Sequence, residues 1–471
     1  MFLAFLVFPF VAALLGFALP GRGRLGVLVA SALVHVGAVA AFWVHRPAPL
    51  GGELLALDDL GLVILSVVSV VFALVSLYTP TYLRRKATPA TGVYVACCLG
   101  LLGSMSLAAC TLHLGVLWVA VEASTLASAP LIAHRTTPAK LEATWKYLVL
   151  CSVGVGLALL GTFFLGIGAT LGPNPIQELT TSALLVAAPR IPAAWLRVGF
   201  VLLLVGYGTK MGLAPLHMWL PDAYAEAPAP ASALFSGALS NVAFLGVVRT
   251  LPVLEAAGQG AFARGLLIAL GLTSLLVSAT FVVYQRDVKR MLAYSSIENY
   301  GVIALGVGLG GLGTYGALLH AVNHSLAKTL LFLLAGNVLV LLGTRDVGRL
   351  WGLGRRAPWT AALLAGGFLA ITGAPPFGLF WSEFTVVRAA LAVHPWVAVA
   401  MLVLLGAAFV GMARIVLSVL HGGDAADPVA HESTGLVLVP ATLFFAVLVL
   451  GFVVPPPLHA LLTSAARAFG G

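Results

Sequence analysis

A lysine, Lys210, lies inside an apolar run from Leu196 to Leu220, with Pro215 five residues after it and Pro221 eleven residues after it. A charged side chain at the centre of a membrane helix costs about 3 kcal/mol, so charged residues kept there usually mark a site. A proline in such a helix frees backbone groups that protein or water must satisfy. A lysine beside a broken helix is typical of ion-translocating proteins, which build their sites this way at the membrane midplane. The alternative, a lysine that extends to the membrane interface, is disfavoured because about fourteen apolar residues precede Lys210.

A glutamate, Glu122, stands near the centre of a second apolar segment, in the sequence Leu117-Trp-Val-Ala-Val-Glu122. An isolated carboxyl group in hydrocarbon is neutral unless a cation lies beside it. We therefore expect either an ion pair between Glu122 and Lys210 or a protonated acid that is hydrogen-bonded to a neighbouring helix.

Three titratable residues, His320, His324 and Lys328, follow one another at intervals of four in a further apolar segment. This spacing places them on one face of an α-helix, over about 12 Å of its length. Histidine titrates near neutral pH, so the row can pass a proton through intervening water. Zinc binding by two histidines is the alternative, but the sequence has no HExxH motif and Lys328 opposes a cation. We expect a proton-transfer row and no metal.

Two further glutamates lie in apolar surroundings. Glu383 follows a second helix break at Pro375 and Pro376, and Glu298 lies in the sequence Ser295-Ser-Ile-Glu298. Glu383 is expected either to end a proton path near one membrane face or to be an ordinary carboxylate at a helix end.

The composition indicates a polytopic membrane protein. Of the 471 residues, 61% are hydrophobic and 9% are charged, whereas soluble domains carry about 25% charged residues. The net charge of +9 comes from basic residues spread singly over short loops, which excludes nucleic-acid binding. The four cysteines lack CxxC spacing, so no iron–sulfur or zinc site is expected. We expect no cofactor in this chain.

Apolar segments long enough to cross about 30 Å of hydrocarbon predict an all-α fold of about fourteen transmembrane helices, with helices 7 and 12 interrupted. The predicted spans are 2–20, 24–44, 58–80, 92–109, 111–133, 142–168, 194–220, 228–251, 262–284, 291–309, 312–342, 358–387, 394–420 and 435–454.

Lysine and arginine placement predicts the orientation. Fourteen of these residues fall in loops after helices 1, 3, 5, 9 and 11, seven fall in loops on the opposite side, and four lie inside helices. Positive residues favour the cytoplasmic side, so the odd-numbered loops are expected to be cytoplasmic and both termini outside.

A short internal similarity predicts a repeat. The segment around Pro215 resembles the segment around Pro376, with a carboxylate, Asp222 or Glu383, seven residues after the proline in each. Helices 7 and 12 are five apart, and an odd number of helices per unit inverts the second copy. The expected organisation is a three-helix segment at 1–91, a first five-helix repeat at 92–251, an inverted second repeat at 262–420, and a C-terminal helix and tail at 421–471. Chance likeness between two Gly/Pro-rich segments remains the alternative.

At these residues the chain resembles the antiporter-like membrane subunits shared by respiratory complex I, group 4 hydrogenases and Mrp cation/proton antiporters. The resemblance is carried by the segments 210–228, 320–332 and 293–298 and covers nearly the whole chain. Leu141-Glu-Ala-Thr-Trp-Lys-Tyr-Leu and the segment 375–384 look most like the F component of hydrogenase-4 and formate hydrogenlyase. The chain ends seventeen residues after the last predicted helix, so the long lateral helix of complex I subunit L is not expected.

The resemblance implies a proton relay. It matches Glu122 to a glutamate that pairs with the broken-helix lysine, the His320 row to a central relay, and Glu383 to a terminal ionisable residue. The expected relay residues are Glu122, Lys210, His217, Asn241, Glu298, His320, His324, Lys328 and Glu383. Complex I subunit M carries a lysine at the position of Asn241, so water held by Asn241, or Glu298, is expected to replace that station.

Two functions follow from the resemblance. The first is a proton-pumping subunit in the cell (inner) membrane, in a redox-driven complex whose peripheral arm and other membrane subunits hold the redox centres. The alternative is an Mrp-type subunit that exchanges Na⁺ or K⁺ for H⁺ without a redox partner. Neither makes this chain a catalyst on its own.

Overall fold

The computed structural model describes residues 1–171, 175–421 and 430–469. Every regular element in these ranges is a helix, and extended residues pair there only in isolated bridges. In the same ranges, eleven helices are long and apolar enough to cross a membrane. The predicted all-α membrane fold is therefore confirmed, whereas the count of fourteen spans and the inverted repeats stay predictions.

The first half of the chain contains α1 (Phe2–Ala18), α2 (Gly21–Val44), α3 (Asp59–Arg85), α4 (Gly92–Ala109), α5 (Leu114–Ile132), α6 (Pro138–Thr170), α7 (Thr181–Ala187), η1 (Ala188–Arg190), α8 (Ala193–Met211), α9 (Leu220–Glu226), α10 (Ala229–Leu234), η2 (Phe235–Leu239), α11 (Ser240–Val248) and α12 (Leu251–Ala256). The second half contains α13 (Gly260–Val282), α14 (Val288–Leu309), α15 (Leu312–Leu342), η3 (Val347–Arg349), α16 (Leu353–Arg356), α17 (Pro358–Ile371), α18 (Gly378–Val393), α19 (Pro395–Leu420), α20 (Thr434–Phe452) and α21 (Pro456–Ala468).

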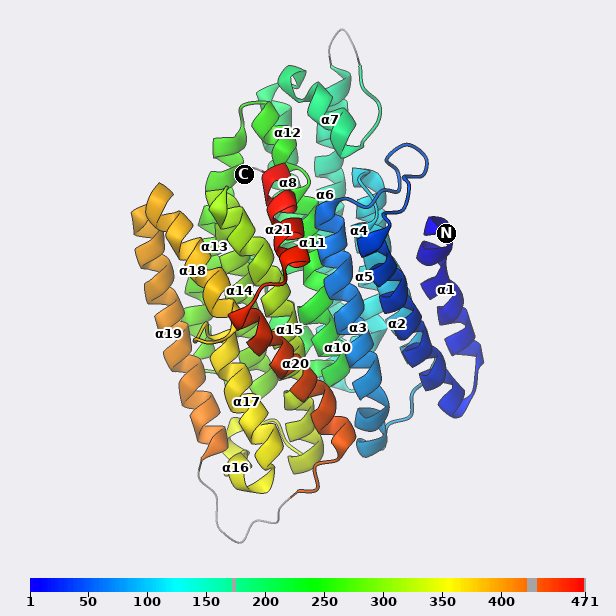
Figure 1. The fold of residues 1–471 in the computed structure, drawn as a ribbon, viewed down its shortest axis with the longest axis vertical. Coiled ribbons are helices and arrows are strands. Elements are labelled where there is room, and N and C mark those ends of the chain that lie inside the picture. Colours follow the sequence, from blue (N-terminus) through cyan, green and yellow to red (C-terminus); the bar gives the residue numbers. More distant parts are fainter. Residues whose placement is uncertain (172–174, 422–429, 470–471) are drawn as a thin grey trace.

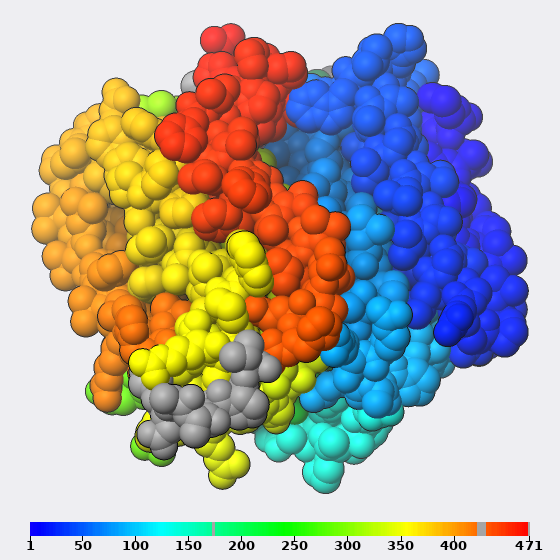
Figure 2. Space-filling model, turned by 60° about the horizontal axis from the view of Figure 1, so that its bottom comes forward, coloured from blue at the N-terminus to red at the C-terminus, as the bar shows by residue number. Residues whose placement is uncertain are grey.

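The long helices form one bundle whose axes run roughly together (Figure 1). Helices α1 and α2 lie on one side and α18 and α19 on the other (Figures 1 and 2), while α15 runs through the middle (Figure 1). Both chain ends lie in the upper half of the bundle in Figure 1. Helix α15 contacts α3, α10, α14, α17, α18, α20 and α21. Residues on α15 are therefore placed to act at the centre of the molecule.

Several helix ends differ from the predicted spans for local reasons. Helix α6 starts at Pro138 rather than near 142, because the Thr137 side chain caps it and a proline suits the first helical position. Helix α14 starts at Val288 because the Asp287 carboxylate accepts two backbone N–H groups there. Helix α3 continues beyond Pro80 to Arg85. The helix α21 was not predicted.

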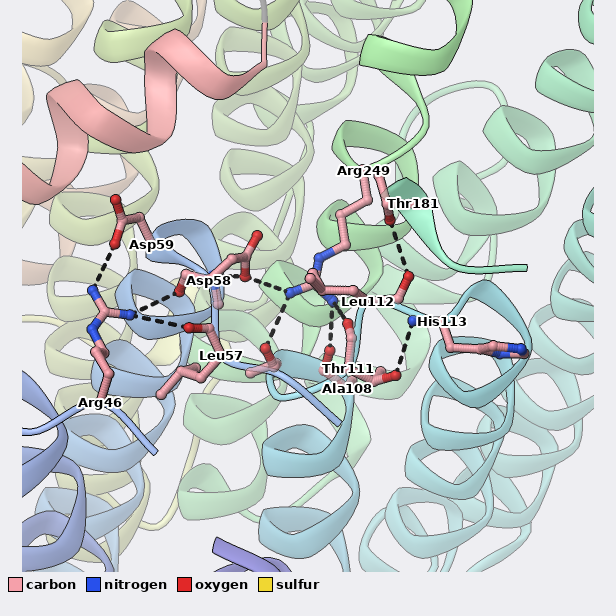
Figure 3. Close-up of polar contacts among 12 residues, drawn as sticks. Arg46, Leu57, Asp58, Asp59, Ala108, Thr111, Leu112, His113, Thr181 and Arg249 are labelled. Atoms are coloured by element: carbon pink, nitrogen blue, oxygen red, sulfur yellow. Dashed lines mark hydrogen bonds and ion pairs between the residues drawn. The ribbon is translucent and has the colours of Figure 1, made fainter. Parts of the chain in front are cut away.

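One buried arginine joins three helix ends at the end of the bundle that carries α7 and α12 (Figure 3). Arg249 is 1% exposed. Its guanidinium donates to the carbonyls of Ala108, Ala109 and Thr111, which lie at or just beyond the end of α4. It also donates to Asp58, 2.9 Å away, whose carboxylate caps the start of α3. This arginine therefore satisfies carbonyls that the end of α4 would otherwise leave unpaired.

Candidate functional site

The first predicted helix break is present, and Lys210 lies at its edge. Helix α8 ends at Met211, and Gly212 follows in the left-handed conformation with φ of 94°. The chain then turns until α9 begins at Leu220. Trp219 returns to donate to the carbonyl of Thr209 at 2.8 Å, which satisfies one group freed by the break. The interruption is thus stabilised by protein contacts, as a break at membrane depth requires.

The Lys210 ammonium is held by hydroxyl groups. Lys210 is 1% exposed, and its Nζ donates to Thr125 Oγ1 at 2.9 Å and to the Tyr147 hydroxyl at 2.5 Å. The ammonium also lies 4.6 Å from the centre of the Tyr147 ring. The negative face of the ring and the carbonyl end of α8 both favour a cation here.

The expected ion pair between Glu122 and Lys210 is not formed. Glu122 is half-buried on α5, and it accepts a hydrogen bond from Ser152 on α6 at 2.8 Å. Its second carboxyl oxygen is buried without a partner among the described residues. The two groups interact electrostatically without direct contact. Tyr147 and Thr125, which the sequence did not single out, occupy the direct contacts of the ammonium.

The predicted row on α15 lies on one buried face. His320, His324 and Lys328 are each 0% exposed. The two imidazole rings stack with centres 6.3 Å apart. His324 has no hydrogen-bond partner on either ring nitrogen among the described residues, and the Lys328 ammonium donates to the Leu292 carbonyl at 2.9 Å. These contacts leave His324 free to bind water or a proton.

His320 links the row to the second half of the molecule. Its Nε2 lies 3.0 Å from Asn299 Oδ1, and its Nδ1 lies 3.0 Å from the Ser382 hydroxyl on α18. Asn299 Nδ2 donates elsewhere, to the Ser295 carbonyl, so its oxygen is the acceptor and His320 Nε2 carries the hydrogen.

The second predicted break lies between α17 and α18, and Glu383 lies on α18 beside it. The carboxyl group packs so closely against Gly373, which has φ of 67°, that a side chain at that glycine would collide with it. Glu298 on α14 is 4% exposed and has one unpartnered carboxyl oxygen among the described residues. It interacts electrostatically with both Lys328 and Glu383. Glu298 is thus near both the α15 row and the second break, and the row also contacts α18 directly through His320 and Ser382.

Asn241 and His217 have different surroundings. Asn241 Nδ2 donates to Ser325 on α15 at 2.8 Å, so it lies beside the row. Asn241 is the second residue of α11, which begins directly after the π-helical turn η2. His217 lies in the first break with its ring 6.4 Å from that of Tyr294. No hydrogen bond or ion pair between described side chains joins His217 to another predicted relay residue.

Sequence reasoning missed a group of buried hydroxyls between the two breaks. The Tyr224 hydroxyl lies 3.1 Å from Ser240 and 3.4 Å from the Tyr300 hydroxyl. The Tyr300 ring contacts the His324 ring, with centres 5.1 Å apart. On the other side, the rings of Trp219 and Phe235 each contact both Tyr147 and Tyr224. In the sequence, the only signal for this group was Tyr224, which follows soon after the first break.

These features define a helical membrane protein with ionisable residues at two helix interruptions. The profile of the NADH:quinone oxidoreductase/Mrp antiporter transmembrane family matches residues 111–409. The hydrogenase-4 component F homolog of Methylacidiphilum infernorum is 35% identical over 86% of this chain and 86% of its own length. The chain belongs to this family, and it is an antiporter-like membrane subunit homologous to those of hydrogenase-4 and complex I.

Solved structures share the fold. A chain of the archaeal membrane-bound sulfane sulfur reductase superposes with a TM-score of 0.90 at 25% identity, covering 99% of this chain and 97% of its own. A chain of the Mrp complex from Dietzia sp. DQ12-45-1b superposes with a TM-score of 0.86 at 20% identity, covering 99% and 97%. The resemblance to antiporter-like membrane subunits that was inferred from the sequence is confirmed.

Proposed function

We propose that this chain moves protons across the membrane as a subunit of a redox-driven respiratory complex of the group 4 hydrogenase or complex I type. The redox centres lie in a peripheral arm, and further membrane subunits complete the assembly. One observation carries the proposal: Lys210 and Glu383 stand at two helix breaks, and the buried polar groups of α14 and α15 lie between them. Burying charged side chains inside a membrane is energetically unfavourable, so charges at these positions indicate a function in transport rather than a purely structural role.

The relay begins at Glu122 and Lys210. Hydroxyl contacts hold the ammonium without a bound carboxylate, so its proton can leave when water enters the break. The path then passes from Tyr147 toward Tyr224 and Tyr300, with water bridging the gap at Trp219 and Phe235.

The second half of the relay runs along α15. The Tyr300 hydroxyl donates to the Ser236 carbonyl, and only its ring contacts His324, so water must carry the proton from the hydroxyl to one of the two unpartnered ring nitrogens of His324. Lys328 and His320 lie one turn away on each side of His324. Glu298 then connects the row to Glu383 at the second break. The tyrosine and serine hydroxyls, with Asn241, take the place of the lysine that complex I subunit M carries at the position of Asn241, on the helix that corresponds to α11.

We also propose the predicted orientation and the inverted repeats at 92–251 and 262–420. Both chain ends lie in the same half of the bundle, which supports placing both on one side of the membrane, and the distribution of lysine and arginine favours the outside. In this orientation the connections α3–α4, α5–α6 and α13–α14 face the cytoplasm, in the inner membrane of the cell.

The alternative is Na⁺ or K⁺ exchange for H⁺ in an Mrp-type assembly. Likeness to the Mrp complex supports the shared fold and no more. Affinity purification of the tagged chain from its native membrane separates the two. Co-purification of a hydrogenase-like or complex I-like arm supports the proposal, and a Na⁺-dependent proton flux without such an arm overturns it.

A further inference from the structure

A cavity of about 430 Å³ opens at one end of the bundle, outside the relay. Its walls come from the end of α3, the α5–α6 connection, the α9–α10 junction, the start of α14 and the end of α15. Small-molecule sites occupy about 300–1,000 Å³, so this cavity is large enough for one. Figure 2 shows this end of the bundle turned forward, with the start of α6 (cyan) beside the end of α3 (blue).

Five basic side chains line this cavity: Lys86, Arg135, Lys140, Lys289 and Arg345. Glu226 is the single carboxylate among the described residues of its wall. Arg345 is the one basic residue here with ion-pair partners in the described chain, since it contacts Glu226 and Asp287. The remaining four positive charges therefore share the cavity without a carboxylate of their own.

These four cations are satisfied only by backbone oxygens or by solvent. Arg135 donates to the Ala87 carbonyl at 2.7 Å, and Lys140 donates to the His134 carbonyl at 2.7 Å. Lys289 is 2% exposed, and its ammonium donates to the carbonyls of Ala225 and Ala227. The charged groups that act on this buried ammonium are Lys140, Arg345, Asp287 and Glu226, and both carboxylates are already paired with Arg345. An anion in the cavity would therefore stabilise the charged form of Lys289.

Two other features favour an anion. Helix α6, which is 33 residues long, begins at the wall with Thr137 as its cap, so its positive dipole end adds to the field. Burial and the neighbouring Lys140 and Arg135 lower the pKa of the His134 imidazole to about 4. His134 is therefore neutral near pH 7, and its Nε2, buried without a partner among the described residues, is available to a ligand.

The cytoplasmic side of a membrane protein commonly carries basic residues. Ordinary basic surface residues do not line a common cavity, whereas the four cations described here do. Arg84 and Arg85 lie at the same helix end, are exposed and do not line the cavity. The four cavity cations come instead from separate parts of the chain and line one open cavity, in which Lys289 is buried, Lys140 is half-buried, and Lys86 and Arg135 are exposed.

We propose that this cavity binds a phosphate group, carried either by the headgroup of an anionic phospholipid or by a free phosphate. Phosphate has several oxygens that accept charge-assisted hydrogen bonds from converging directions, which suits cations on several walls. Basic pockets between membrane helices on the cytoplasmic side are typical lipid-headgroup sites.

The test uses the purified full-length chain and two substitutions, Lys86→Gln with Arg135→Gln. Both side chains are exposed, so the double variant should fold. Arg84→Gln with Arg85→Gln is the matched control, because it removes the same charge from the same end of the molecule. Binding of inorganic phosphate is measured by thermal shift at constant ionic strength against chloride. Bound phospholipid is measured by native mass spectrometry after reconstitution with and without phosphatidylglycerol.

The expected result is that the Lys86/Arg135 variant binds phosphate or the anionic lipid at least about tenfold more weakly, while the control changes by less than about twofold. Binding of inorganic phosphate assigns the free anion, and retention of phosphatidylglycerol alone assigns the lipid. Equal losses in both variants, or no binding of either probe by the wild-type chain, would overturn the proposal. None of these readouts depends on proton translocation.

Discussion

At the scale of single residues, the hydroxyl environment of Lys210 changes how its proton is released. An ammonium paired directly with a carboxylate keeps its proton strongly, whereas one bound to Thr125 and Tyr147 has neutral partners that water can replace. Glu122, hydrogen-bonded to Ser152, then acts on Lys210 through the field alone.

The two relay lysines give the first prediction. Lys210→Met and Lys328→Met should each abolish proton pumping while assembly and electron transfer persist, because each removes a proton carrier from a buried path. Pumping is measured in sealed vesicles with the assembled complex at wild-type levels. Full pumping by either variant would assign that lysine a structural role.

The tyrosine hydroxyls give the second prediction. Tyr224→Phe with Tyr300→Phe should slow pumping at least about tenfold, since proton transfer loses its positioned groups while the rings still pack. Tyr207→Phe is the control, because Tyr207 is equally buried and its hydroxyl has no partner in the described chain.

A third substitution that restores pumping in the double tyrosine variant would strengthen this test. Asn241→Lys in the double variant should restore part of the flux by placing an ammonium beside Ser325 and the α15 row. If Lys210→Met stops pumping but the two tyrosine substitutions do not, the relay stands and the hydroxyl path is wrong.

At the scale of helices, Arg249 and the glycines of α6 fix the positions of the relay elements. Helix α6 carries Tyr147, and it packs against α8, which carries Lys210. At Gly161 an added Cβ would lie 2.6 Å from the Gly199 carbonyl oxygen, so the two backbones can approach only without a side chain.

This close approach gives the third prediction. Gly161→Val should separate α6 from α8, lower the thermal stability of the protein and impair pumping. Gly156→Val on the same helix should be tolerated, because an added Cβ there meets nothing within 4 Å. Thermal unfolding of the purified variants in one detergent compares them directly.

The arginine at the end of α11 gives the fourth prediction. Arg249→Met should destabilise the protein by about 3 kcal/mol, since it leaves the Asp58 carboxylate and the last carbonyls of α4 without their partner. Arg46→Met removes a partly exposed pair with Asp59 and should cost less than about 1 kcal/mol. Equal losses of stability in the two variants would show that the buried contacts of Arg249 contribute no more than a surface ion pair.

At the scale of the whole molecule, orientation gives the fifth prediction. Cysteines at Arg85 and Arg190, which are exposed and lie in connections predicted to face opposite sides, should label from opposite sides of the membrane. Arg85 is expected on the cytoplasmic side. Labelling of both positions by an impermeant reagent from outside would contradict the proposed orientation.

The sequence by itself determined the fold class, the family and the identity of most charged residues in the candidate relay. Charges such as Lys210 and Glu298 stand out because hydrocarbon penalises them wherever they occur, and the i, i+4 spacing of His320, His324 and Lys328 specifies a shared helix face whatever that face contacts. Prolines and glycines likewise located both breaks.

Only the tertiary structure decided which side chains contact the charged relay residues. Tyr147, Tyr224 and Tyr300 come from three helices, and a tyrosine in an apolar helix has no sequence pattern that separates a packing ring from a positioned hydroxyl. For the same reason the expected contact of Glu122 with Lys210 was wrong: which group reaches the ammonium depends on helix rotation over a few ångströms. The basic cavity depends on contacts between segments more than 200 residues apart, such as Lys86 and Arg345, whose convergence follows from packing alone.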